Sequence, residues 1–148
     1  MRGAEVRLTV IAFILVISGL AARAADTPLD AHKYPQDTPK KTLTSIVKAL
    51  EKRDFEYWIV WLIVPEDTKK LIAKHGSLEA VVLMNADDKH APRIKQQIEI
   101  IRDMLKADKV TEGTENGVTW VRYADDNKIL QLEKQPDGRW CMNTKIKD

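Results

Sequence analysis

The sequence has very little cysteine: Cys141 is the only one among 148 residues. A single cysteine cannot form a disulfide within the chain, so an apolar core must hold the fold together. We expect Cys141 to be a small buried residue of a strand, because a free cysteine packs as a small hydrophobe. An intermolecular disulfide or a reactive thiol is the alternative, and a reactive thiol needs a neighbouring base to form the thiolate.

The chain also lacks an excess of either charge. It carries 24 basic and 22 acidic residues, and the imbalance lies at the N-terminus, where Arg2, Arg7 and Arg23 face only Glu5. The remaining residues therefore hold 24 − 3 = 21 basic and 22 − 1 = 21 acidic groups. A domain without a basic stripe lacks the electrostatic footprint of nucleic-acid binding, so we predict no nucleic-acid partner.

Motifs for catalysis and metal binding are missing as well. The three histidines, His32, His75 and His90, are scattered along the chain. There are no paired carboxylates, no Ser/His/Asp set with its supporting motif and no glycine-rich phosphate loop. The acidic pair Asp87-Asp88 beside His90 lacks the spacing, the central glycine and the distant glutamate of a calcium loop. The sequence therefore predicts no catalytic residue, no metal ligand and no cofactor.

No apolar run is long enough to span a bilayer, which needs about 20 residues. The longest run, Leu8 to Leu20, has thirteen residues and follows a short segment with two arginines. The small residues of Ala22-Arg23-Ala24 then fit a signal-peptidase site, which predicts a signal peptide over 1–24 and cleavage before Ala25. We expect an exported protein, periplasmic or extracellular, with no stable membrane anchor after cleavage. An uncleaved anchor is the alternative.

The mature chain divides into an extended lead-in, 25–37, and a single domain, 38–148. Apolar residues recur at helical spacing through the first part of that domain, as at Leu43, Ile46, Val47 and Leu50. Helices are predicted over 39–52, 55–63, 65–74, 78–85 and 92–107. On the last helix we expect an outward-facing i,i+4 ion pair between Lys95 and Glu99.

The segment 55–64 is ambiguous between helix and strand. Four of its ten residues are β-branched, which favours a strand, but periodicity cannot separate the two in a run this short. We choose a short buried helix, 55–63, because it would place Trp58 and Trp61 on one side. Core packing of these tryptophans and the lining of a ligand pocket are both open.

Four short strands follow, over 109–114, 118–123, 128–134 and 139–146. Asn116-Gly117 is a strong hairpin signal, since both residues tolerate the positive φ of a type I′ turn. Short turns between successive strands predict an antiparallel meander. The expected fold class is α+β, with N-terminal helices packed on one face of a C-terminal four-stranded sheet. We expect Trp120 and Trp140 to pack against these helices.

Helices followed by such a sheet are similar to the nuclear-transport-factor-like cone families, also called cystatin-like α+β. The resemblance rests on the opening helix Thr38–Leu50, the Arg53-Asp54 pair after it and the closing Asp137-Gly138-Arg139-Trp140. It covers Thr38 to Ile146. It implies a curved sheet with a concave face, as in small exported bacterial proteins of unassigned function, although this chain has fewer and shorter strands than such families.

The resemblance leaves the function open, because members include enzymes, ligand carriers and interaction domains. The enzymes resemble one another in an Asp, Tyr or His inside the cone, and only Asp54, Tyr57 and Tyr123 could take that place here. Our main hypothesis is a non-enzymatic domain that binds a partner protein or a small apolar ligand in the concave face of its sheet. The candidate binding residues are the aromatic side chains Trp58, Trp61, Trp120 and Tyr123.

Two other functions stay open. One is a cone-type enzyme, an isomerase or hydrolase with a buried acid/base residue. The other is a homodimer formed through the edge strands of an open sheet.

Overall fold

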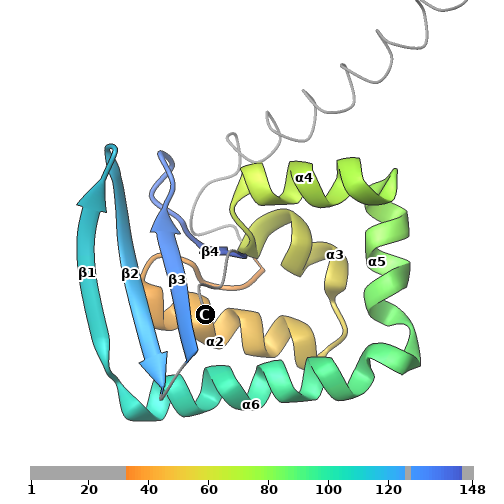
Figure 1. Cartoon of the computed structure of the whole chain (residues 1–148), viewed down its shortest axis with the longest axis horizontal. Coiled ribbons are helices and arrows are strands. Elements are labelled where there is room, and N and C mark those ends of the chain that lie inside the picture. The colour runs from red at the N-terminus through yellow and green to blue at the C-terminus, as the bar shows by residue number, and fades with distance from the viewer. Residues whose placement is uncertain (1–32, 126–127, 145–148) are drawn as a thin grey trace, which may run out of the picture.

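The computed structural model describes residues 33–125 and 128–144. The predicted signal peptide, His32 and the start of the lead-in lie outside the described residues. A four-stranded sheet stands beside a group of helices, with α6 running from the far helices back to the sheet (Figure 1). The predicted α+β class is confirmed.

The helices begin and end within one residue of the predicted bounds. Their caps follow the sequence: Thr38 Oγ1 accepts a hydrogen bond from the Lys41 N–H at 3.3 Å, and Gly76 ends α4 with a φ of 91°. Among the described residues, no helix combines the length and hydropathy that crossing a bilayer needs. The helices are α2 (Pro39–Glu51), α3 (Phe55–Tyr57), the π-helix η2 (Trp58–Leu62), α4 (Pro65–His75), α5 (Leu78–Ala86), the 3-10 helix η3 (Asp88–His90) and α6 (Ala91–Ala107).

The sheet is an antiparallel meander of β1 (Val110–Glu115), β2 (Val118–Asp125), β3 (Lys128–Lys134) and β4 (Trp140–Asn143), in that order. Asn116 and Gly117 have φ angles of 52° and 78°, as the predicted hairpin turn requires. The predicted fourth strand covers 139–146; β4 ends at Asn143, and residues 145–146 lie outside the described residues. After β4, the Thr144 N–H donates to Asp67 Oδ2 at 3.0 Å.

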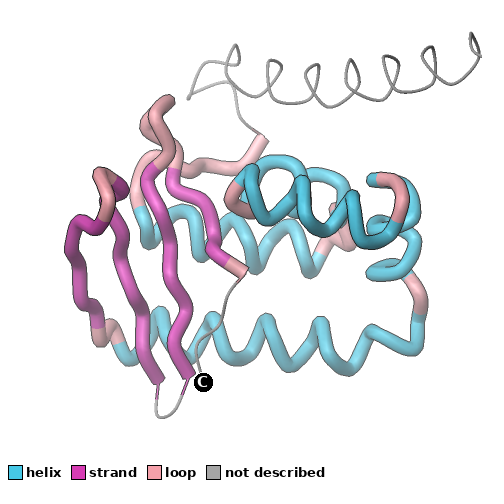
Figure 2. Tube along the Cα trace, turned by 45° about the horizontal axis from the view of Figure 1, so that its top comes forward, coloured by secondary structure: helices cyan, strands magenta, loops and turns pink. Residues whose placement is uncertain are grey.

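One face of the sheet, here called the inner face, packs against the helices (Figure 2). Its side chains are 8% exposed or less and belong to the main core: Val121, Tyr123, Leu130, Leu132, Trp140 and Met142. Trp140 therefore packs as predicted. The prediction for Trp120 is wrong, because alternation along β2 places Trp120 on the opposite, outer face.

The ambiguous segment is helical, but its second part winds as a π-helix. A π-helix bonds i to i+5 and holds more residues per turn, so side chains three apart no longer share a side. Trp58 is 8% exposed and joins the core, whereas Trp61 is half-buried with its ring 6.1 Å from that of Tyr57. The expected shared side for the two tryptophans is wrong for this reason.

One edge of the sheet is closed by other parts of the chain. The Trp140 N–H donates to the carbonyl of Gln36 at 2.9 Å, and the Val64 N–H donates to the carbonyl of Met142 at 2.9 Å. Both bonds lie on the side of β4 that faces away from β3. The packed domain thus begins before Thr38, inside the predicted lead-in.

Gln36 is the buried link in this closure. It is 0% exposed, and its Nε2 donates to the carbonyls of Trp61 at 2.7 Å and Trp140 at 3.1 Å. A buried carbonyl that loses its donor costs free energy, since water cannot replace the bond. Gln36 therefore ties the lead-in, η2 and β4 into one unit.

We predict that Gln36→Ala lowers the free energy of unfolding by about 2 kcal/mol, because the Trp140 carbonyl loses its donor and the Trp61 carbonyl loses the nearest of its three donors. Gln96→Ala, at an exposed position of α6, is the control and should change it by less than about 0.5 kcal/mol. Urea unfolding of both variants measures the difference. Equal stabilities would contradict the role of Gln36.

Candidate functional site

The four predicted binding residues do not form one site. Trp58 and Tyr123 belong to the buried core, and burial raises the pKa of the Tyr123 phenol above its usual value. Trp61 is half-buried beside Tyr57, where the Arg139 guanidinium lies 5.4 Å from its ring centre. Trp120 lies on the outer face of the sheet. Of the four, only Trp61 and Trp120 are placed where a ligand could reach them.

The outer face carries a stripe of apolar, aromatic and arginine side chains. The stripe follows the outward positions of β2 and continues onto β3; we call it the outer stripe, and it consists of Val118, Trp120, Arg122, Ala124 and Ile129. Val118 is 38% and Ile129 39% exposed. Along β2 it is about 20 Å long, at some 3.4 Å per residue. At β4 this face is covered, because Cys141 is buried against the Trp61 carbonyl of η2 and Gln36, whereas Val118 and Ile129 stay exposed toward the ends of the stripe.

Trp120 is held in the stripe from two sides. The Arg122 guanidinium carbon lies 4.1 Å from the centre of its ring. On β1, Gly113 is the paired residue, and a Cβ there would lie 2.5 Å from Cζ2 of Trp120. The ring therefore rests on the bare backbone of Gly113, which only glycine permits.

A row of polar side chains fixes Arg122; we call it the polar ladder, and it consists of Arg122, Gln131, Glu133 and Asn143. Arg122 Nε donates to Gln131 Oε1 at 2.7 Å, and Gln131 Nε2 donates to Glu133 Oε1 at 2.9 Å. The Asn143 Nδ2 donates to that same oxygen at 2.5 Å. All four side chains are half-buried. Because the ladder crosses β2, β3 and β4, it holds the guanidinium over Trp120 before any partner arrives.

Two of the three residues that the resemblance singled out come together elsewhere. Asp54 Oδ2 accepts from the Lys33 ammonium and from the Tyr34 hydroxyl at 3.4 Å. The Tyr57 hydroxyl accepts from the Tyr34 N–H at 3.3 Å, and the two rings meet edge to face at 4.9 Å. Burial raises the pKa of both phenols. These contacts join the lead-in to α3. Tyr123 takes no part in them and lies in the buried core against the inner face of the sheet.

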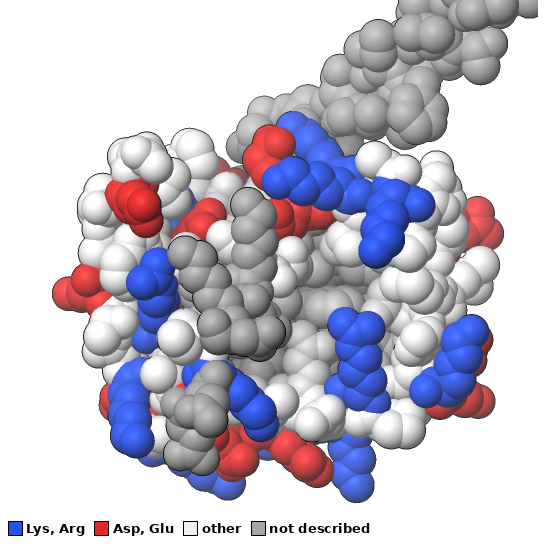
Figure 3. Space-filling model, in the orientation of Figure 1, with Lys and Arg blue, Asp and Glu red and all other residues white. Residues whose placement is uncertain are grey.

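The histidines and acidic residues form no metal centre in the described part of the chain, where no three metal-ligating side chains converge. His75 lies in the last turn of α4 and His90 in η3. Asp87 accepts from the Lys89 N–H at 3.0 Å and also pairs with the Lys89 ammonium, so it caps η3. Basic and acidic side chains are interspersed on the face shown in Figure 3.

The comparisons with known proteins give no neighbour: no family model, no curated protein and no solved structure matches this chain. The resemblance to the cone families stays a prediction.

Cys141 lies deep in the described structure. It is 0% exposed and lies between Gln36 Nε2, at 3.9 Å, and the Trp61 carbonyl, at 3.5 Å. Burial raises the pKa of its thiol to about 12. The thiol is therefore protonated at neutral pH and is structural, as the sequence led us to expect.

We predict that iodoacetamide labels Cys141 only after unfolding in urea. Since the folded pKa, about 12, lies above the ordinary value of 9.0, the thiol contribution to stability is complete below pH 9 and is lost as the pH rises toward 12. The loss should be roughly 1.4 kcal/mol per pH unit. Cys141→Ala is the control, because it keeps the tyrosines but lacks this slope. Parallel stability curves for the two proteins would contradict the assignment.

Proposed function

We propose that this chain is an exported, non-enzymatic binding domain that takes a partner protein on the outer stripe of its sheet. The observation that carries the proposal is the Trp120–Arg122 stack, placed in an apolar stripe whose end residues Val118 and Ile129 are exposed. The free face of an antiparallel sheet is ordinarily polar, so this composition needs a reason. Tryptophan and arginine are the residues most enriched where proteins bind one another.

The geometry favours a protein over a small apolar ligand. An apolar ligand would need a concavity, but the inner face of the sheet is filled by its own side chains. The outer stripe is an extended surface, on which a small molecule would bury only one side. A protein surface can cover the whole stripe and supply acceptors for Arg122.

Each part of the stripe has a distinct role in this proposal. Trp120 is the central anchor, and its position over Gly113 costs little to order on binding because the ring is already fixed. Arg122 is held by the polar ladder and keeps its remaining N–H groups for the partner. Val118 and Ile129 lie toward the two ends and add apolar contact.

The alternative is a cone-type enzyme, and the observation in its favour is the meeting of Asp54, Tyr34 and Tyr57. However, the Asp54 carboxylate already accepts from Lys33 and Tyr34, and the raised pKa of both phenols keeps them protonated at neutral pH. A general base needs a free acceptor near neutral pH. Binding is therefore the better-supported function.

We predict that Trp120→Ala abolishes capture of a partner from a cell-envelope extract, because it removes the anchor of the stripe. Gly113→Ala should weaken capture too, since its Cβ displaces the Trp120 ring while the tryptophan stays. Lys40→Glu, an exposed residue of α2 away from the stripe, is the control. Quantitative mass spectrometry should identify a protein recovered with the wild type and with Lys40→Glu only. Equal recovery of every protein by all four forms contradicts the proposal.

The proposed export can be tested separately from binding. The mature protein should be found outside the cytoplasm and should begin at Ala25, because the small residues Ala22 and Ala24 fit the peptidase. Ala24→Phe should block cleavage and leave the precursor. N-terminal sequencing distinguishes the two, and a wild-type protein that keeps Met1 would overturn the proposal of cleavage.

A further inference from the structure

The tip of the hairpin between β1 and β2 carries an asparagine followed directly by a glycine, Asn116-Gly117. Both residues are exposed, and the turn gives them φ angles of 52° and 78°. The side-chain amide of an asparagine can be attacked by the backbone nitrogen of the next residue, and glycine hinders this least because it has no Cβ. Contacts in the folded protein then determine whether such an attack is open or blocked.

At the hairpin tip the attack is open. A Cβ built on Gly117 would meet no atom within 4 Å. In the described part of the chain, neither the Asn116 side chain nor the Gly117 N–H is hydrogen-bonded. The peptide group between the two residues must turn toward the side chain for the reaction. The tip adjoins the exposed pair of Glu115 and Val118, so a local opening there disturbs no core and costs little.

The chain has one other step of this kind, Asp137-Gly138, and its contacts block it. Both carboxylate oxygens of Asp137 accept from Arg139: Oδ1 from the backbone N–H at 3.1 Å, and Oδ2 from Nε at 2.7 Å. The Gly138 N–H, which would have to attack, donates to the carbonyl of Gln135 at 2.9 Å. A carboxylate that stays ionised in this way is a poor electrophile, so this step is protected.

The two other asparagines in the described part of the chain are held as well. Asn85 lies inside α5, where its Nδ2 donates to a backbone carbonyl at 2.8 Å, and Ala86 follows it. The Nδ2 of Asn143 donates into the polar ladder at 2.5 Å. The next N–H after Asn143, that of Thr144, already donates to Asp67 Oδ2 at 3.0 Å. Both asparagines are half-buried, so the fold leaves Asn116 as the reactive one of the three.

We propose that Asn116 is a modification site, at which the folded protein loses ammonia and ends as aspartate or isoaspartate. The Gly117 nitrogen gives its proton to hydroxide and forms a bond to Cγ of Asn116, while the bond from Cγ to Nδ2 breaks. Nδ2 takes a proton from water and leaves as ammonia, and a five-membered succinimide stays. Water then adds to one of the two ring carbonyls, and the ring opens to aspartate or to isoaspartate. The net reaction is the hydrolysis of one amide.

Both products alter the end of the hairpin. Each adds a negative charge next to Glu115, and isoaspartate also adds one carbon to the main chain of the two-residue turn. Since Glu115 and Val118 pair directly beside that turn, the extra carbon disturbs their register. Val118 ends the outer stripe, so modified copies carry an altered stripe. The reaction itself does not depend on the proposed binding function.

Incubation of the purified protein in mildly alkaline buffer, followed by peptide mapping with mass spectrometry, measures the reaction residue by residue. Asparagine should be lost at position 116, while Asn85 and Asn143 stay intact over the same time. The rate should rise in proportion to the hydroxide concentration, because the deprotonated nitrogen attacks. Isoaspartate should form as well as aspartate, whereas direct hydrolysis of the side chain gives aspartate alone.

A matched variant and an unfolded sample serve as controls. Asn116→Gly removes the amide but keeps a residue that a type I′ turn accepts, so it should fold alike and form no isoaspartate in the hairpin. Unfolding in urea should release Asp137 from Arg139 and let isoaspartate appear there too. The proposal would be overturned by a folded protein that keeps Asn116 under conditions that convert it in urea. Equal conversion at Asn85 or Asn143, or aspartate without isoaspartate, would overturn it as well.

Discussion

The β4 edge of the sheet depends on the hydrogen bonds that the carbonyl oxygen of Trp61 accepts. This oxygen lies at the end of a π-helix and accepts from Gln36 Nε2 at 2.7 Å, Arg139 Nη1 at 3.3 Å and Cys141 Sγ at 3.5 Å. The donors come from the lead-in, the turn before β4 and β4 itself. Because all three are 3% exposed or less, no water competes for the carbonyl, and the three segments must meet there for the fold to form.

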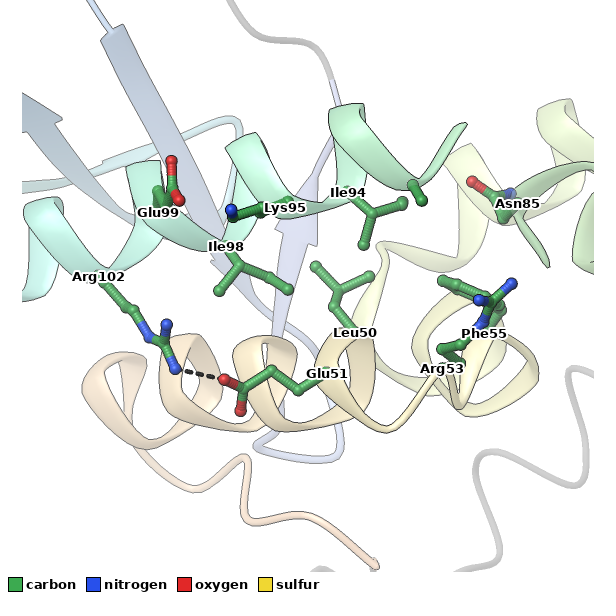
Figure 4. Close-up of a pocket in the computed structure, with 11 residues that line it drawn as sticks. Leu50, Glu51, Arg53, Phe55, Asn85, Ile94, Lys95, Ile98, Glu99 and Arg102 are labelled. Atoms are coloured by element: carbon green, nitrogen blue, oxygen red, sulfur yellow. Dashed lines mark hydrogen bonds and ion pairs between the residues drawn. The ribbon is translucent and has the colours of Figure 1, made fainter. Parts of the chain in front are cut away.

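This junction determines which surfaces are left for binding. Once Gln36 and Val64 have closed the edge at β4, the helices that follow pack over the inner face and fill it with side chains. On the outer face, Val118 and Ile129 stay exposed toward the two ends of the stripe. Between α2 and α6 the helices leave a groove, and the ion pair between Arg102 and Glu51 bridges it (Figure 4). The ion pair expected on α6 between Lys95 and Glu99 is not formed in the described part of the chain.

Part of the outer stripe could be predicted from local chemistry. Asn116-Gly117 requires a two-residue turn, and such a turn places Gly113 opposite Trp120. A tryptophan facing a glycine across two strands indicates a ring that lies on the neighbouring backbone. Arg122 was missed, because its importance arises from the ladder through Gln131 and Asn143, and that ladder needs the register of three strands.

The sequence by itself determined the helices, the hairpin and the meander, since periodicity, caps and turn residues act over a few neighbouring positions. It also indicated that Cys141 is structural. The tertiary structure decided which aromatic residues are buried: Trp58 and Tyr123 are core, while Trp120 faces outward. It also decided the π-helix and the Gln36 junction, because burial and long-range hydrogen bonds depend on segments as much as 104 residues apart.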